Sequence, residues 1–147
     1  MLAATTKLNT PGARLSAMAD VHALTDVTGF GLAGHLLEIC RGSRLAATVR
    51  FADLPLIPEA RAWAEQGIAT GASDRNWAGY GHEVRLPAGM PDWQQKMVTD
   101  PQTSGGLLVA CAPAAAAAVI AEFRKDGFDE ACVIGSLAAG PATLTLV

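Results

Sequence analysis

The sequence predicts an α+β fold in which helices cover a layered sheet. Three observations predict it. Helix-like and strand-like patterns are interspersed along the chain, a continuous apolar run at Leu107–Ala112 has the character of a buried strand, and two strand-like segments follow each other at the end. The 147 residues are half hydrophobic and 17% charged, which is typical of one globular domain that needs neither disulfides nor a metal to fold.

Charge and cysteine usage exclude several classes of protein. A net charge of −3 and a pI near 5.5 argue against binding to nucleic acid or to an acidic membrane. Met1–Thr10 lacks the apolar core of a signal peptide, and no run reaches the ~20 apolar residues of a membrane span. Cys40, Cys111 and Cys132 fit neither a disulfide framework nor a zinc spacing, so we expect small buried thiols in a cytoplasmic protein.

The predicted helices share start and stop signals. A capping residue or a proline precedes most of them, and a glycine follows several, as helix termini prefer. They are Pro11 to about Ala19, Gly29–Arg41 with Thr28 as N-cap and Gly42 at its end, Glu59–Gln66 before Gly67, Asp92 to about Met97, and Pro113–Asp126 before Gly127.

The predicted strands are short apolar or alternating runs bounded by turn residues. They are Val21–Thr25, Leu45–Phe51, Glu83–Leu86, Leu107–Ala112, Ala131–Ser136 and Thr143–Val147, the last two as a terminal hairpin. Between the strands, Leu54–Pro58 is expected to be extended. Gly67–Gly81 is predicted to be a long, irregular loop, and loops of this length are often functional.

The most informative stretch is Leu24–Leu36, which reads LTDVTGFGLAGHL. It predicts a strand end, a tight glycine turn and a helix start, where backbone N–H groups and the helix dipole favour an anion. Asp26 stands just before the turn, where a carboxylate can hold a hard cation over that anion. We therefore predict a phosphate and magnesium corner, with Asp26 as metal ligand and Thr28, Gly29 and Gly31 as the residues that bind the phosphate-bearing cofactor.

Each of these residues also has a purely structural interpretation. Asp26 has the chemistry of a helix-capping carboxylate, and Gly29 and Gly31 suit turn geometry or close packing. His35 lies one turn further on, beside apolar residues, so a satisfied structural histidine is favoured over a catalytic one.

Three other groups leave the same choice open. The turn Thr103–Gly106 suits an anion nest or a plain turn into a strand. Arg75 and Asn76 suit a loop that closes over a nucleotide or a solvent-exposed turn. The three tryptophans suit an adenine-stacking face or ordinary packing, and nothing places them together; they are Trp63, Trp77 and Trp93.

Four segments carry a resemblance to a known family and cover essentially the whole chain. They are LTDVTGFGLAGHL at Leu24–Leu36, LPLIP at Leu54–Pro58, GASDRN at Gly71–Asn76 and DPQTSGGLL at Asp100–Leu108. In this order they resemble the C-terminal domain of the selenophosphate synthetase (selenide, water dikinase) family. That family belongs to a superfamily that also includes aminoimidazole ribonucleotide synthetase.

The resemblance implies a layered α/β sandwich that is partly ferredoxin-like, with a mixed or antiparallel sheet. It implies a reaction of ATP, selenide and water that yields selenophosphate, AMP and phosphate, with magnesium ions on the nucleotide. In that family the catalytic Cys or selenocysteine, the essential Lys and most metal-binding aspartates lie in an N-terminal domain. By this resemblance, residues 1–147 correspond to the C-terminal half, carry no catalytic residue, and contribute Asp26 as a metal ligand.

The implied partners are the N-terminal domain or a second subunit, together with ATP and selenide, and a homodimer is an open option. We expect the chain alone to be inactive. Two alternatives stay open: a non-catalytic binding or interaction module, and another ATP-using member of the same superfamily.

Overall fold

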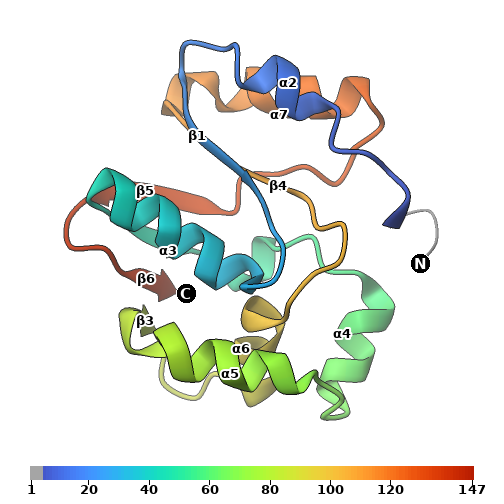
Figure 1. Ribbon diagram of the computed structural model, residues 1–147, viewed down its shortest axis with the longest axis vertical. Helices are drawn as coiled ribbons and strands as arrows, with labels where there is room; N and C mark the ends of the chain where they lie inside the picture. Colours follow the sequence, from blue (N-terminus) through green and yellow to red (C-terminus); the bar gives the residue numbers. More distant parts are fainter. Residues whose placement is uncertain (1–4) are drawn as a thin grey trace.

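A computed structural model describes residues 5–147 and has the α+β architecture expected from the sequence (Figure 1). The helices lie in two groups at opposite ends of the molecule, with a four-stranded sheet and one long helix between them. One group holds α2 (Pro11–Leu15) and α7 (Ala116–Lys125). The other holds α4 (Pro58–Glu65), α5 (Gly71–Tyr80) and α6 (Asp92–Thr99), and the helix between the groups is α3 (Gly31–Ser43). Single 3₁₀ turns cover Phe51–Asp53, Gly81–Glu83 and Pro113–Ala115.

The strands form two sheets, one of which is mixed. They are β1 (Val21–Asp26), β2 (Leu45–Val49), β3 (Val84–Arg85), β4 (Leu107–Cys111), β5 (Gly135–Ala139) and β6 (Leu144–Leu146). β1 and β4 pair antiparallel, with Asp26 opposite Leu107. The larger sheet has the order β3-β6-β2-β5, in which β6 runs parallel to both of its neighbours and β2 runs antiparallel to β5.

The main core lies where α3 packs between the larger sheet and the pair α5 and α6. Its most deeply buried side chains come from all three layers: Leu37 and Cys40 from α3, Leu144 and Leu146 from β6, and Val98 from α6, each at most 1% exposed. Burying a side chain of this size contributes about 1.5–3 kcal/mol relative to leaving it in water. This core therefore holds α3 between the larger sheet and α6.

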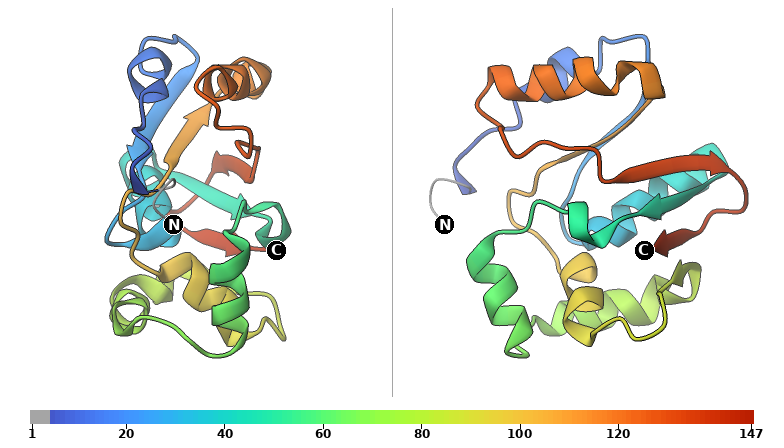
Figure 2. Two further views of the ribbon diagram at one scale, coloured as in Figure 1. Left: turned by 90° about the vertical axis from the view of Figure 1, so that its right-hand side faces the viewer. Right: turned by 180° about the vertical axis from the view of Figure 1, so that it is seen from behind.

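A second, smaller core joins α2 and α7 to the β1–β4 ribbon. Figure 2 shows these two helices side by side at one end of the molecule, above the paired strands. Leu15, Val119 and Phe123 are its buried centre. Leu24, Leu107 and Val109 of the ribbon pack against it.

Several predicted helix ends are wrong by a few residues. The first helix ends at Leu15 and not near Ala19. α3 begins after Phe30, not after Thr28, and it ends at Ser43 with Arg44 in the left-handed conformation at φ 56°, so Gly42 does not end it. The glycine endings at Gly67 and Gly127 are confirmed, because both adopt positive φ and donate to carbonyls of the preceding helix.

The predicted loop Gly67–Gly81 is wrong in its main part, because residues 71–80 form α5. Thr70 is the N-cap, and its side chain accepts a hydrogen bond from the Ser73 N–H. The glycines in this stretch gave it the pattern of a loop. The helix forms because its buried side, which includes Ser73 and Tyr80, is stabilised by tertiary contacts.

The predicted terminal hairpin is also wrong. The first of its strands is β5 at Gly135–Ala139, shifted from Ala131–Ser136, and β2 lies between β5 and β6 in the sheet. Gly135 shows why β5 needs a glycine, since a Cβ there would lie 2.0 Å from the Thr48 carbonyl oxygen of β2.

Within residues 5–147, no helix has the length and apolar character needed to cross a bilayer. The expectation that Met1–Thr10 holds no signal-peptide core falls partly on residues 1–4, which lie outside the described part of the chain.

Candidate functional site

Two of the four segments that carry the family resemblance, Leu24–Leu36 and Asp100–Leu108, meet in space. The loop between β1 and α3 lies along the loop between α6 and β4. The Val27 N–H donates to the Gly106 carbonyl at 2.9 Å, and the Gln102 N–H donates to the Thr28 carbonyl at 3.0 Å. The predicted glycine turn is therefore one wall of a two-loop structure, which we call the glycine corner (residues 26–31 and 99–106).

Gly105 and Gly31 allow this close approach of backbone to backbone. A Cβ on Gly105 would lie 1.9 Å from the Val27 carbonyl oxygen. A Cβ on Gly31 would lie 2.7 Å from the Thr99 carbonyl carbon, and Gly31 also has a φ of 67°. The Gly31 N–H donates to the Thr28 carbonyl at 3.1 Å. Packing thus accounts for both glycines, and the amide of Gly31 is already engaged.

Gly29 is different, because it is exposed and a Cβ there would meet nothing within 4 Å. Its carbonyl accepts a hydrogen bond from Asn76 Nδ2 at 2.9 Å, and the same amide group donates to the Thr99 carbonyl at 2.9 Å. Asn76 lies on α5, so the GASDRN segment joins the other two motifs at the corner. The sequence left open whether Asn76 lies in a loop that closes over a nucleotide or in a solvent-exposed turn. In the structure its side-chain amide links the two loops of the corner by hydrogen bonds.

Buried hydroxyls secure the base of the corner. Ser73 and Thr99 are both fully buried, and their hydroxyl groups lie 2.6 Å apart. Ser73 also donates to the Lys96 carbonyl, and Thr70 donates to the Asp100 carboxylate at 2.7 Å. These bonds hold the end of α6 against α5, and no pattern in the sequence indicated them.

Asp26 ends β1 as an exposed side chain. Among residues 5–147, no hydrogen bond, ion pair or helix cap engages its carboxylate, so the capping interpretation is wrong. Within the same range there is also no group of three or more His, Cys, Asp or Glu side chains able to hold a metal ion. The donor set fits a contribution of one carboxylate to a magnesium ion, which typically takes one or two carboxylates with waters and phosphate oxygens.

Thr28 does not cap α3. Its hydroxyl instead shares a hydrogen bond of 3.1 Å with His35 Nε2, and His35 Nδ1 lies 3.0 Å from a carboxylate oxygen of Glu38. His35 is 8% exposed, with the Phe30 ring 5.7 Å away between centroids. Both ring nitrogens of His35 thus have partners, as expected of a satisfied histidine, and one of them, Thr28, belongs to the corner.

Tyr80 supports the corner from behind. Its hydroxyl donates to the Phe30 carbonyl at 2.5 Å, and burial raises the pKa of Tyr80 to about 12. Gly34 leaves the room for this contact, because a Cβ there would lie 3.0 Å from the Tyr80 ring. Tyr80 therefore stays a neutral donor at physiological pH.

Trp63, Trp93 and the LPLIP segment lie outside the corner, whereas Trp77 follows Asn76 on α5 and packs against the main core. Trp63 is 53% exposed, and Trp93 packs edge-on against Phe51 with ring centroids 5.5 Å apart. No aromatic contact within residues 5–147 joins two tryptophans. LPLIP and Trp93 instead line an open apolar groove of about 650 Å³.

The cysteines are not activated. Burial raises the pKa of all three thiols, which disfavours the reactive thiolate. Cys40 is buried and Cys111 partly so, whereas Cys132 is exposed, which corrects the expectation that all three are buried.

Comparison with known proteins places this geometry in a family. Residues 3–146 match the family described as AIR synthase related protein, C-terminal domain. The selenide, water dikinase of Paraburkholderia xenovorans (strain LB400) is 59% identical over 147 residues, which are 100% of this chain and 42% of that protein. The enzyme of the same name from Dechloromonas aromatica (strain RCB) is 52% identical over the same shares.

The chain thus spans about two fifths of the length of these curated relatives. Among solved structures, the hydrogenase maturation protein HypE in complex with ATP superposes with a TM-score of 0.60 at 20% identity, over 95% of this chain and 36% of that one. At this identity the likeness shows a shared fold. The chain belongs to the AIR synthase related protein C-terminal domain family.

Proposed function

We propose that this chain is the C-terminal domain of a selenide, water dikinase, the enzyme that converts ATP, selenide and water to selenophosphate, AMP and phosphate. Identity of 52–59% to proteins of that name over the whole chain supports it. The observation that carries the proposal is the free Asp26 carboxylate at the edge of the corner where three signature segments converge.

In this proposal Asp26 supplies one ligand to a magnesium ion on the nucleotide. The ion neutralises phosphate charge, which is a main contribution to catalysis of phosphoryl transfer. Gly29 is exposed and Thr28 is half-buried beside it, and in this proposal the backbone at these two residues gives the phosphates a close approach. Gly31 acts indirectly, because it lets α3 begin against the end of α6.

The remaining ligands and the nucleophile come from a partner domain, either in the same polypeptide or in a second subunit. The chain's share of 42% of its relatives' length leaves room for one. Phe30 supports contact at the corner, since it is a large apolar side chain that is 53% exposed one residue from Gly29.

The test is selenide-dependent AMP formation by this chain joined to a matching N-terminal domain. We expect turnover in the joined protein, none in the chain alone, and a loss of at least about 100-fold with Asp26→Asn, as for other preorganised electrostatic groups. Asp129→Asn is the matched control, because Asp129 is an exposed carboxylate in the loop after α7. Turnover by the chain alone, or full activity of Asp26→Asn, would reject the proposal.

A further inference from the structure

His35 is a buried imidazole with both nitrogens engaged. One side of the ring meets Glu38 at 3.0 Å, one turn further along α3, and the other meets the Thr28 hydroxyl at 3.1 Å. The Phe30 ring lies beside it, and Tyr80 holds the Phe30 carbonyl. The imidazole is thus fixed between a carboxylate and a residue of the glycine corner.

The chemistry of the two partners sets the direction of these hydrogen bonds. A carboxylate only accepts, so His35 Nδ1 carries the proton that is donated to Glu38. In the neutral ring Nε2 is then an acceptor, and the hydroxyl of Thr28 donates to it. The proton of Thr28 is therefore committed to the imidazole, and its oxygen is left with lone pairs only.

Thr28 is also held in place through its backbone. Its carbonyl accepts from the Gly31 N–H at 3.1 Å and from the Gln102 N–H at 3.0 Å. Within residues 5–147, no hydrogen bond other than that to His35 engages its hydroxyl oxygen. Thr28 as a residue is half-buried.

We propose that His35 and Glu38 are positioning residues that make the Thr28 oxygen an acceptor for the hydrated magnesium ion held by Asp26. Asp26 is two residues away, so the two Cα atoms lie within about 7 Å. Hydroxyl oxygens serve as magnesium ligands in other phosphate-binding loops, and a hydroxyl that donates to a base has the right polarity for that contact. The side chain of Thr28 thereby faces the cation and not the phosphate oxygens.

The first test measures the imidazole itself, without ligand. Nitrogen-15 NMR of the His35 ring in the 147-residue chain is expected to show a protonated Nδ1 and an unprotonated Nε2. In Glu38→Gln this tautomer preference weakens. A ring protonated at Nε2 in the wild-type chain would overturn the proposed polarity.

The second test measures the cation, with Mn²⁺ as a paramagnetic probe in the presence of ATP. We expect Mn²⁺ to broaden the Thr28 methyl resonance, and Thr28→Val to weaken Mn²⁺ affinity about tenfold, as loss of an outer-shell partner does. Thr28→Ser restores affinity. His35→Gln added to Thr28→Val brings no further loss, because His35 acts through the hydroxyl. His82→Gln is the control, since His82 is an exposed histidine remote from Thr28 in sequence.

Because this role presupposes the magnesium site of the proposed function, Asp26→Asn is titrated in the same series. If Asp26→Asn weakens Mn²⁺ binding but Thr28→Val does not, the role of Thr28 is wrong and the proposed function stands. If Asp26→Asn has no effect on Mn²⁺ binding by the chain joined to a matching N-terminal domain, both are overturned. Additive losses from Thr28→Val and His35→Gln would also reject the positioning role.

Discussion

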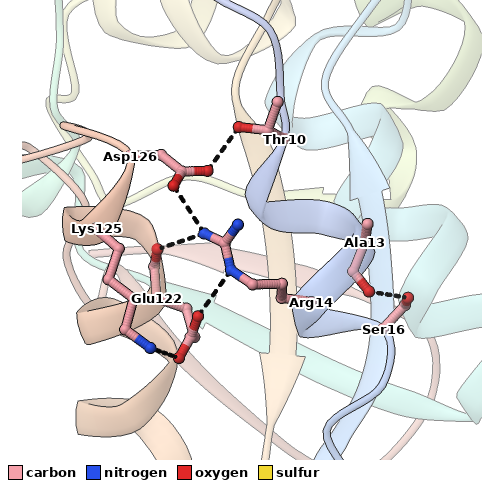
Figure 3. Close-up of polar contacts among 7 residues, drawn as sticks. All are labelled: Thr10, Ala13, Arg14, Ser16, Glu122, Lys125 and Asp126. Carbon is pink, nitrogen blue, oxygen red and sulfur yellow. Dashed lines mark hydrogen bonds and ion pairs between the residues drawn. The ribbon is translucent and has the colours of Figure 1, made fainter.

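The glycine corner and the α2–α7 layer are held together in opposite ways. At the corner the polar contacts come from buried or half-buried side chains: the Asn76 amide donates to the Gly29 and Thr99 carbonyls, and the Ser73 and Thr99 hydroxyls bond to each other. In the α2–α7 layer the polar contacts lie on the surface. Figure 3 shows Arg14 of α2 reaching both Glu122 and Asp126, with Thr10 donating to Asp126 and Lys125 paired with Glu122.

This difference indicates that the backbone geometry is fixed tightly at the glycine corner, whereas the α2–α7 layer needs only to stay packed on the rest of the domain. Ion pairs on the surface are screened by water and contribute little, so the α2–α7 layer relies on its small apolar core. Buried hydrogen bonds contribute modestly to stability but allow few alternative backbone arrangements. The corner is therefore the preorganised part of the molecule, which suits its proposed role in positioning charge.

The largest effect is expected from Gly105→Ala. Its Cβ would stand 1.9 Å from the Val27 carbonyl oxygen, which forces the two loops apart. We expect a loss of about 3 kcal/mol or more in the free energy of unfolding, above the usual cost of overpacking, or failure to fold. Urea denaturation measures it. Gly29→Ala is the matched control, because a Cβ there meets open space; equal losses in the two variants would show that the loops are not in close contact.

The next largest effect is expected from Leu15→Ala, which changes the apolar core of the α2–α7 layer. Leu15 is fully buried between α2 and α7, and removal of its side chain leaves a cavity. We expect a loss of about 3 kcal/mol in the free energy of unfolding. The hydrogen-bonded corner stays intact, so amide exchange at Gly31 and Gln102 keeps its protection relative to global unfolding. Selective loss of protection at those amides would mean that the two regions are not independent.

Ser73→Ala is expected to cost about 1–2 kcal/mol, because it leaves the buried Thr99 hydroxyl without one partner. The effect should concentrate at the corner, visible as faster amide exchange in residues 99–106. Ala72→Ser, one position away on α5, serves as the comparison for a change in hydroxyl content alone. An unchanged exchange rate in Ser73→Ala would remove this pair from the support of the corner.

The smallest effect is expected from Arg14→Gln, and it depends on pH. The pKa of Glu122 is lowered first by its hydrogen bond with Lys125 and then by that with Arg14, and the pKa of Asp126 first by its hydrogen bond with Thr10 and then by that with Arg14. A lowered folded-state pKa stabilises the protein above the unfolded pKa, and this contribution is lost as pH falls through the acid range. The melting temperature of wild type should therefore exceed that of Arg14→Gln slightly at pH 7 and converge with it on acidification. A gap that widens at low pH contradicts this assignment.

The sequence predicted the α+β class, the main helices and the place of the corner, because local signals determine these. Thr25–Gly31 has a strand end before it and a helix period after it, and both are confirmed. The approach of Gly105 to Val27 was not predictable, since it depends on β1 pairing with β4 across the chain. That pairing turns an isolated glycine turn into a two-loop corner.

The errors have physical causes of the same kind. Thr28 looked like an N-cap, but its hydroxyl bonds to His35, and α3 begins after Phe30. The helix at Gly71–Tyr80 was missed because its glycines lower helix propensity, although the cap at Thr70 was a readable signal. The hairpin failed because β2 inserts between the last two strands, which no local pattern reports. The partial ferredoxin likeness, and the roles of Asp26, Thr28, Gly29 and Gly31 toward a nucleotide, stay predictions.

We propose that Asp26 gives this domain one magnesium ligand at a preformed corner. The most direct test is calorimetric titration of ATP with Mg²⁺ into the 147-residue chain, its Asp26→Asn variant and its Asp129→Asn control. We expect weak binding by the wild type and the control, and binding at least about tenfold weaker in Asp26→Asn. Equal affinity of all three proteins for Mg²⁺–ATP would contradict the claim.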